Sequence, residues 1–86
     1  MAYAITLADS ARKELRSFPS HVVERVFPKL RELATNPRPS GCKKLHGEQN
    51  SWRIRVGDYR IVYSIDDEQK LVDVVHIARR KEVYEP

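Results

Sequence analysis

The run Trp52–Tyr63, WRIRVGDYRIVY, is the segment that most restricts how this chain can fold. On each side of the pair Gly57-Asp58, apolar and polar residues alternate, which is typical of strands with one buried face. Glycine at the first of two central positions is what a two-residue type II′ turn requires. The run therefore predicts a tight β-hairpin in which Arg55 lies opposite Arg60.

This register gives the hairpin two chemically different faces, because side chains alternate across a strand. The face expected to pack on the helices carries Trp52, Ile54, Val56, Tyr59, Ile61 and Tyr63. The opposite face carries Arg53, Arg55, Arg60 and Val62. Like charges directly opposite each other destabilise a strand pair by a few tenths to about 1 kcal/mol, so folding alone gives no reason for this arrangement. A bound phosphate would remove the penalty, since guanidinium groups bind phosphate oxygens bidentately. The alternative left open is a solvated, wet sheet face.

The residues before the hairpin predict one strand and two helices. Apolar residues alternate over Tyr3–Leu7, as in a half-buried strand, and Asp9 or Ser10 can then cap a first helix. Pro19 ends that helix, and Ser20 can cap a second.

The second helix carries a broad apolar stripe from Val22 to Ala34, which indicates core rather than a site. Pro28 lies inside the stripe and lacks an amide donor, so we expect a kink or two abutting helical pieces. Residues 36–41 form a Pro- and Gly-rich loop. The remaining chain predicts a meander of strands at 43–46, 52–56, 59–65 and 71–78, with an acidic turn at 66–69.

Length and charge bound the function. With 86 residues, the chain predicts a single domain over residues 1–86, too small for a large substrate cavity. Its net charge is +4, and residues 38–60 hold six Lys or Arg against two acidic residues. A concentrated basic segment favours a polyanionic partner, although a solvated basic surface would have the same composition.

The sequence also predicts a soluble, cytoplasmic protein. Its first residues lack the pattern of a signal peptide, and no apolar run approaches the roughly 20 residues that span a bilayer. The single Cys42 cannot form an internal disulfide and is expected to be a structural thiol rather than a nucleophile.

The order of elements, together with the segments KKLHG, WRIRVGDYRIVY and RRKEVY, resembles the RelE/ParE toxin superfamily over essentially the whole chain. The resemblance implies an α+β fold in the order β-α-α-β-β-β-β: a curved antiparallel sheet with two N-terminal helices packed on one face. RelE-like members are ribosome-dependent endoribonucleases that cut messenger RNA in the decoding site without a metal or other cofactor. The resemblance also implies a cognate acidic, RelB-like antitoxin that silences the toxin in a hetero-oligomeric complex.

The family's catalytic positions fall on Arg53, Arg55, Arg60, Arg80 and Tyr84. The first two are arginines where lysine is common in the family, which keeps the charge but weakens a role as proton donor. Cations around Tyr84 would favour its anionic form and make it a general base. The alternative is that Tyr84 is a packing aromatic.

RNA-binding residues are expected at Lys43, Lys44, His46, Arg79 and Lys81. His46 is a second candidate base, ranked below the tyrosine, and His76 is expected to serve strand packing. The best hairpin register places Arg79 on the same face as the other arginines and Arg80 on the core face, although a bulge would reverse this.

Two rival functions remain open. ParE-like members share the fold but poison DNA gyrase without the full catalytic set, and a non-catalytic RNA- or antitoxin-binding module would also carry a basic hairpin. The fold alone does not separate these three functions.

Overall fold

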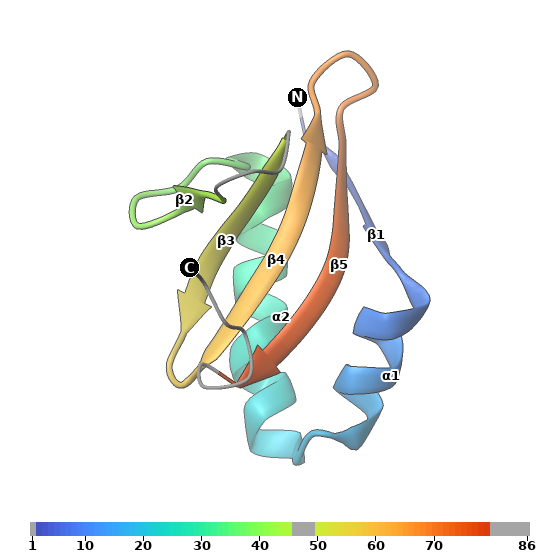
Figure 1. The fold of residues 1–86 in the computed structure, drawn as a ribbon, viewed down its shortest axis with the longest axis vertical. Coiled ribbons are helices and arrows are strands. Elements are labelled where there is room, and N and C mark those ends of the chain that lie inside the picture. Colours follow the sequence, from blue (N-terminus) through green and yellow to red (C-terminus); the bar gives the residue numbers. More distant parts are fainter. Residues whose placement is uncertain (1, 46–49, 80–86) are drawn as a thin grey trace.

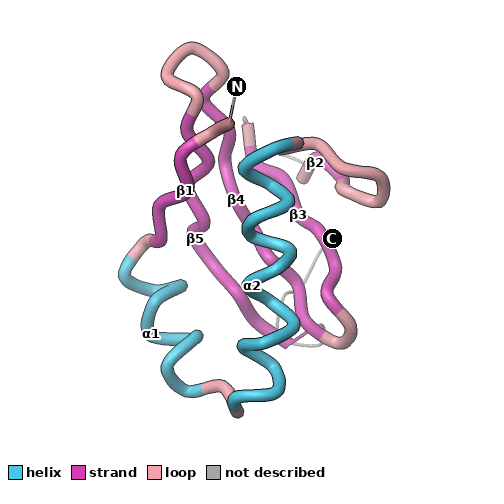
Figure 2. Tube along the Cα trace, turned by 180° about the vertical axis from the view of Figure 1, so that it is seen from behind, coloured by secondary structure: helices cyan, strands magenta, loops and turns pink. Residues whose placement is uncertain are grey.

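The computed structural model describes residues 2–45 and 50–79, which form five strands and two helices. In chain order these are β1 (Ala4–Leu7), α1 (Asp9–Ser17), α2 (Ser20–Thr35), β2 (Lys43–Lys44), β3 (Ser51–Val56), β4 (Tyr59–Asp66) and β5 (Leu71–Arg79). The strands form one twisted sheet in the order β1-β5-β4-β3-β2, with α2 running along one face of it (Figures 1 and 2). The predicted α+β fold with two helices on a curved sheet is confirmed.

One strand departs from the antiparallel arrangement. The segment β2 to β5 is the predicted antiparallel meander, but β1 pairs in parallel with β5, from Ala4 opposite Leu71 to Leu7 opposite Val74. The sheet is therefore mixed. The alternation of apolar residues in β1 reveals a half-buried strand but carries no information on the direction of its neighbour.

The start of α1 differs from the prediction. The N-cap residue is Ala8, which has no capping side chain, so the predicted caps Asp9 and Ser10 are wrong. Asp9 is instead the first helical residue, where a carboxylate interacts favourably with the helix dipole. Ser10 donates its hydroxyl to the carbonyl of Val75 at 2.6 Å and so links the helix to β5.

The second helix is continuous. It begins at Ser20 with Pro19 as the N-cap residue, so Ser20 is the first helical residue and not the cap. Pro28 lies inside the helix without dividing it into two pieces. Its side chain is exposed, so the ring projects away from the sheet rather than into the core.

The core lies between the helices and the sheet. Its buried members are Ala11, Leu15, Val22, Val26, Leu30, Leu33, Ile54, Ile61, Tyr63, Ile65, Val72, Val74 and Ile77. Trp52, Val56 and Tyr59 pack against them, so the predicted core face of the hairpin is confirmed. Each fully buried aliphatic or aromatic side chain contributes about 1.5–3 kcal/mol, which makes this layer the main source of stability.

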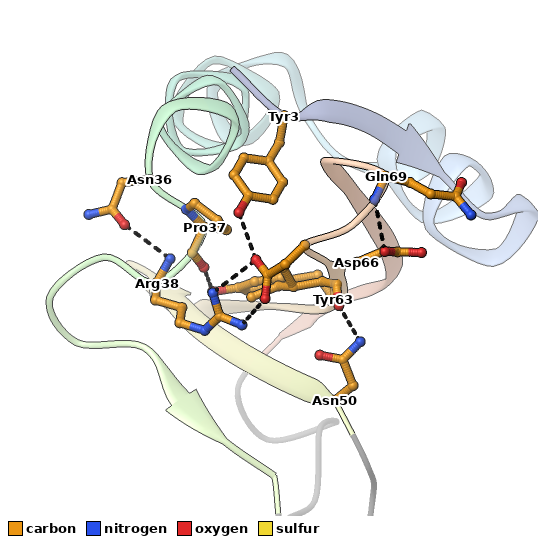
Figure 3. A network of polar contacts seen from close by, with 10 residues as sticks. Tyr3, Asn36, Pro37, Arg38, Asn50, Tyr63, Asp66 and Gln69 are labelled. Atoms are coloured by element: carbon orange, nitrogen blue, oxygen red, sulfur yellow. Dashed lines mark hydrogen bonds and ion pairs between the residues drawn. The ribbon is translucent and has the colours of Figure 1, made fainter. Parts of the chain in front are cut away.

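A polar cluster fastens the loop after α2 to the sheet (Figure 3). Arg38 donates to both carboxylate oxygens of Asp67, at 3.3 and 3.0 Å, and Tyr3 donates to the same carboxylate at 2.6 Å. The hydrogen bond from Arg38 holds the pKa of Asp67 below its ordinary value. The Arg38 guanidinium also lies 5.1 Å from the centre of the Trp52 ring, and the buried Tyr63 hydroxyl donates to the carbonyl of Pro37 at 2.8 Å. These contacts position the loop that leads into β2 beside β3.

Candidate nucleic-acid interface

The β3–β4 hairpin has the register that the sequence predicts. Arg55 lies directly opposite Arg60, and Arg53 lies opposite Val62. Gly57 has φ +60°, whereas Asp58 has no positive φ, as a type II′ turn requires. The two-residue turn thus aligns the arginines on one face of the hairpin.

A fourth cation joins these three arginines from the neighbouring strand. Lys43 in β2 lies opposite Arg53, so it projects to the same side of the sheet. We call Lys43, Arg53, Arg55 and Arg60 the arginine face. Neighbouring strands are about 4.8 Å apart and alternate residues about 6.6 Å apart, so the four side chains start within reach of a single phosphate or of two successive ones.

The members of the arginine face differ in exposure. Arg55 is exposed and Arg53 half-buried, but Arg60 is only 9% exposed. The alternative in which all the arginines of this face are solvated is therefore excluded, because Arg60 is buried. Charge interactions are stronger where water is displaced, so a phosphate gains more binding free energy from the buried Arg60 than from the exposed Arg55.

A hollow of about 370 Å³ opens beside the arginine face, where the short β2 leaves part of the β3 edge uncovered. Its described lining residues are Lys29, Ser40, Gly41, Lys43, Arg53, Ile54 and Arg55. None of these carries a carboxylate, although Lys29 is paired with Glu32 at 2.7 Å outside the hollow. The hollow extends the positive surface from the sheet toward α2.

Two predicted RNA-binding residues lie on the other side of the sheet. Lys44 is opposite Trp52, on the face toward the helices. Arg79 is opposite Tyr59, also on that face, so its predicted place on the arginine face is wrong. The cause is an irregularity in the β4–β5 register between Val62 and Tyr63, which shifts the alternation of β5 by one residue.

The remaining predicted residues lie outside the described part of the chain: His46, Arg80, Lys81 and Tyr84. Within residues 2–45 and 50–79, no three His, Cys, Asp or Glu side chains cluster as they would around a metal ion.

His76 is a residue near this face that sequence reasoning assigned to strand packing. It lies opposite Val62 in β5, its side chain is 41% exposed, and its Nδ1 is 2.9 Å from the Glu14 carboxylate. The other oxygen of Glu14 accepts the backbone N–H of Ile77 at 2.7 Å. Glu14 thereby covers the part of the β5 edge that β1 does not reach. The partners are more than 60 residues apart in sequence, so no local pattern reveals the contact.

Comparison with known proteins agrees with this geometry. The model of the family described as ParE toxin of the type II toxin–antitoxin system, parDE, matches residues 5–84. The chain is 34% identical to Toxin RelE of Mycobacterium tuberculosis, over 95% of this chain and 86% of that protein. It is 35% identical to mRNA interferase toxin RelE of Escherichia coli, over 98% of this chain and 92% of that protein.

Solved structures show the same fold. The archaeal RelE–RelB complex from Pyrococcus horikoshii matches with a TM-score of 0.82 at 27% identity, covering 93% of this chain and 97% of that one. The isolated E. coli RelE toxin matches with a TM-score of 0.80 at 32% identity, covering 91% of this chain and 84% of that one. Neither described helix has the length and apolar composition needed to cross a membrane. The chain therefore belongs to the RelE/ParE superfamily, as a RelE-type toxin of a toxin–antitoxin system.

Proposed function

We propose that residues 1–86 act as a single-domain endoribonuclease that cleaves messenger RNA in the decoding site of the ribosome and so inhibits translation. The observation that carries the proposal is the arginine face, where four cations from three adjacent strands share one side of the sheet and one of them, Arg60, is buried. The name of the E. coli relative, an mRNA interferase, supports the same reaction.

The reaction needs no metal. A ribose 2′-oxygen attacks the adjacent phosphorus and forms the new P–O2′ bond, while the bond from phosphorus to the 5′-oxygen of the next nucleotide breaks. The products are a 2′,3′-cyclic phosphate and a free 5′-hydroxyl. Negative charge accumulates on the phosphoryl oxygens during the reaction, and preorganised cations stabilise it. We assign this role to Arg53, Arg55, Arg60 and, from the resemblance, Arg80.

Two protons must move in this reaction. A base takes the proton of the 2′-hydroxyl, and an acid protonates the leaving 5′-oxygen. We assign the base to Tyr84, with His46 as the second candidate, and RNA contacts to Lys43 and Lys81. Lys44 and Arg79 point to the helix side of the sheet, so we do not place them at the scissile phosphate.

We further propose that the toxin is cytoplasmic and is neutralised by an acidic, RelB-like antitoxin in a hetero-oligomer. The solved relatives from P. horikoshii and M. tuberculosis are toxin–antitoxin complexes. An acidic partner would complement the arginine face and compete with RNA for it. A purified complex that cleaved RNA as fast as the free toxin would contradict this mechanism of neutralisation.

The test is cleavage of messenger RNA on programmed ribosomes under single-turnover conditions, with both new RNA ends identified. The wild-type protein should yield 5′-hydroxyl and 2′,3′-cyclic phosphate ends without added metal. Tyr84→Phe removes only the phenolic oxygen, and loss of a general base should slow cleavage about 10²–10⁴-fold. Wild-type rates in that variant would remove Tyr84 from the mechanism and favour His46 or a base from the ribosome.

The same preparation separates the nuclease from a gyrase poison. A wild-type protein that leaves messenger RNA intact on ribosomes but inhibits DNA gyrase would overturn the proposal. Since the fold is common to both types of toxin, this functional assay decides between them.

A further inference from the structure

A second group of basic side chains lies on the helix side of the hairpin turn, behind the arginine face. There the start of α2, the β3–β4 turn and the end of β5 meet at one end of the molecule (Figures 1 and 2). They enclose a pocket of about 190 Å³, roughly six times the volume of a water molecule in the liquid. The described lining residues are His21, Val22, Arg25, Val26, Val56, Asp58, Tyr59 and Arg79.

Two arginines reach this pocket from different elements. Arg25 projects from α2 and lies across the turn: a β-carbon at Gly57 would be 3.6 Å from one of its terminal nitrogens. Arg79 arrives from β5 because the register shift turns its side chain toward the helices. His21 lies one helical turn before Arg25 and adds a third nitrogen-bearing side chain. The pocket therefore combines two guanidinium groups with an imidazole.

Three of the polar side chains that line the pocket, those of Arg25, His21 and Asp58, have no partner among the described residues. Within the described residues, the side chains of Arg25, His21 and Asp58 form no hydrogen bond or ion pair, although Arg25 and Asp58 line the same pocket. The Arg25 guanidinium lies near Gly57 without a hydrogen bond or ion pair among the described residues. Its guanidinium donors thus remain available to an external anion.

The remaining walls fit the rest of a nucleotide. Asp58 at the tip of the turn offers carboxylate oxygens that can accept a hydrogen bond from a ribose hydroxyl. Val56 and Tyr59 provide an apolar wall for the sugar or the base. A pocket that binds only an anion would not be strengthened by the Asp58 carboxylate. A ribonucleotide can use both kinds of charge, because its phosphate binds the arginines and its ribose hydroxyl binds the carboxylate.

We propose that this pocket is a ribonucleotide subsite, in which Arg25 and Arg79 bind a phosphate and Asp58 accepts a hydrogen bond from the 2′-hydroxyl. The inference rests on the proposed action on RNA. An RNA strand that crosses the Gly57-Asp58 turn would be held on both sides of it, by the arginine face and by this pocket. The subsite would then favour RNA over DNA at a position away from the scissile phosphate.

The direct test is an NMR titration of the full chain with adenosine 5′-monophosphate, its 2′-deoxy analogue and inorganic phosphate. The ribonucleotide should shift the Arg25 Nε–H and His21 ring signals and bind several-fold tighter than the other two ligands. Arg25→Ala should abolish the shift at His21, and Arg25→Gln serves the same purpose if the alanine variant unfolds. Arg31→Ala is the matched control, since it removes another exposed arginine of α2 that does not line the pocket.

A second measurement uses single-stranded RNA at increasing salt. Each lost phosphate contact should reduce the slope of log Kobs against log salt by about 0.7. Arg25→Ala should show this reduction and Arg31→Ala should not. Asp58→Ala should lose the preference for RNA over DNA.

The outcomes separate this subsite from the proposed nuclease. If ribosomal cleavage occurs but no ligand shifts the His21 and Arg25 signals, the subsite is wrong and the nuclease stands. If the ligands bind without cleavage, the nuclease is wrong and the pocket stands as a ribonucleotide site. Equal binding of all three ligands would reduce it to a phosphate site and overturn the assignment of Asp58. Shifts caused only by an acidic peptide would assign the pocket to a protein partner instead.

Discussion

Replacing Arg55 with alanine should separate catalysis from stability. Arg55 is exposed and lies directly opposite Arg60, so the folded protein contains a pair of like charges across the two strands. Such a pair costs a few tenths to about 1 kcal/mol. Removing the exposed member should leave the free energy of unfolding unchanged or raise it by up to about 1 kcal/mol. For a domain of this size, 1 kcal/mol corresponds to a rise in Tm of about 4–8 °C.

The same substitution should slow the reaction. Loss of one preorganised donor to transition-state charge typically costs about 10²–10³ in rate, or about 2.7–4 kcal/mol in activation free energy. Thermal unfolding measures the first effect, and single-turnover cleavage on ribosomes measures the second. Arg31→Ala removes an equal charge from the exposed side of α2 and should change neither.

Arg60→Ala provides the contrast. Its side chain is 9% exposed, so truncation removes buried packing as well as charge, and Tm should fall together with cleavage. The reasoning would be refuted if Arg55→Ala lowered Tm by 10 °C or more, because that residue would then be a structural anchor. Full cleavage activity in Arg55→Ala or in Arg60→Ala would equally refute the catalytic role of the arginine face.

Three further predictions concern the scaffold. Gly57→Ala places a side chain at φ +60° and should lower stability by about 1–2 kcal/mol in urea unfolding; an unchanged midpoint would mean that the turn has another geometry. Tyr63→Phe leaves the buried carbonyl of Pro37 without its donor and should cost about 1–3 kcal/mol, which a matched denaturation curve would detect or exclude. The ion pair with Arg38 holds the pKa of Asp67 below its ordinary value of 3.8, so the stability that this pair contributes is present above about pH 4 and is lost as the pH falls through the lower folded pKa. The free energies of unfolding of wild type and Asp67→Asn should therefore differ at neutral pH and converge in acid. A difference in unfolding free energy that does not change with pH would contradict this.

The hairpin was predictable because its information is local. A two-residue turn with glycine first leaves one register, and that register places Arg55 opposite Arg60 and Arg53 on the same face. The helices and the core stripe were predictable for the same reason, since periodicity is a property of neighbouring residues. The first residues of the two helices, next to Ala8 and at Ser20, were less predictable, because capping depends on the path by which the chain enters each helix.

The position of Arg79 was not predictable. One irregularity between Val62 and Tyr63 reverses the faces of every later residue in β5, and no glycine or proline marks it in the sequence. The pairing of Glu14 with His76 and the parallel direction of β1 depend equally on contacts between distant segments. The second basic cluster followed from these long-range features, so the sequence indicated a single basic face where the structure has two.

The parallel pairing of β1 with β5 also constrains the order of folding. Residues 4–7 find their partners at residues 71–74, so this strand pair closes a loop that contains nearly the whole domain. Closing a loop of that length carries a large entropic cost, which favours docking of β1 after the meander has formed. A growing polypeptide cannot make this contact before β5 has been synthesised. The arginine face lies on β2, β3 and β4, so this surface can form with the meander and does not depend on the last strand pair to close.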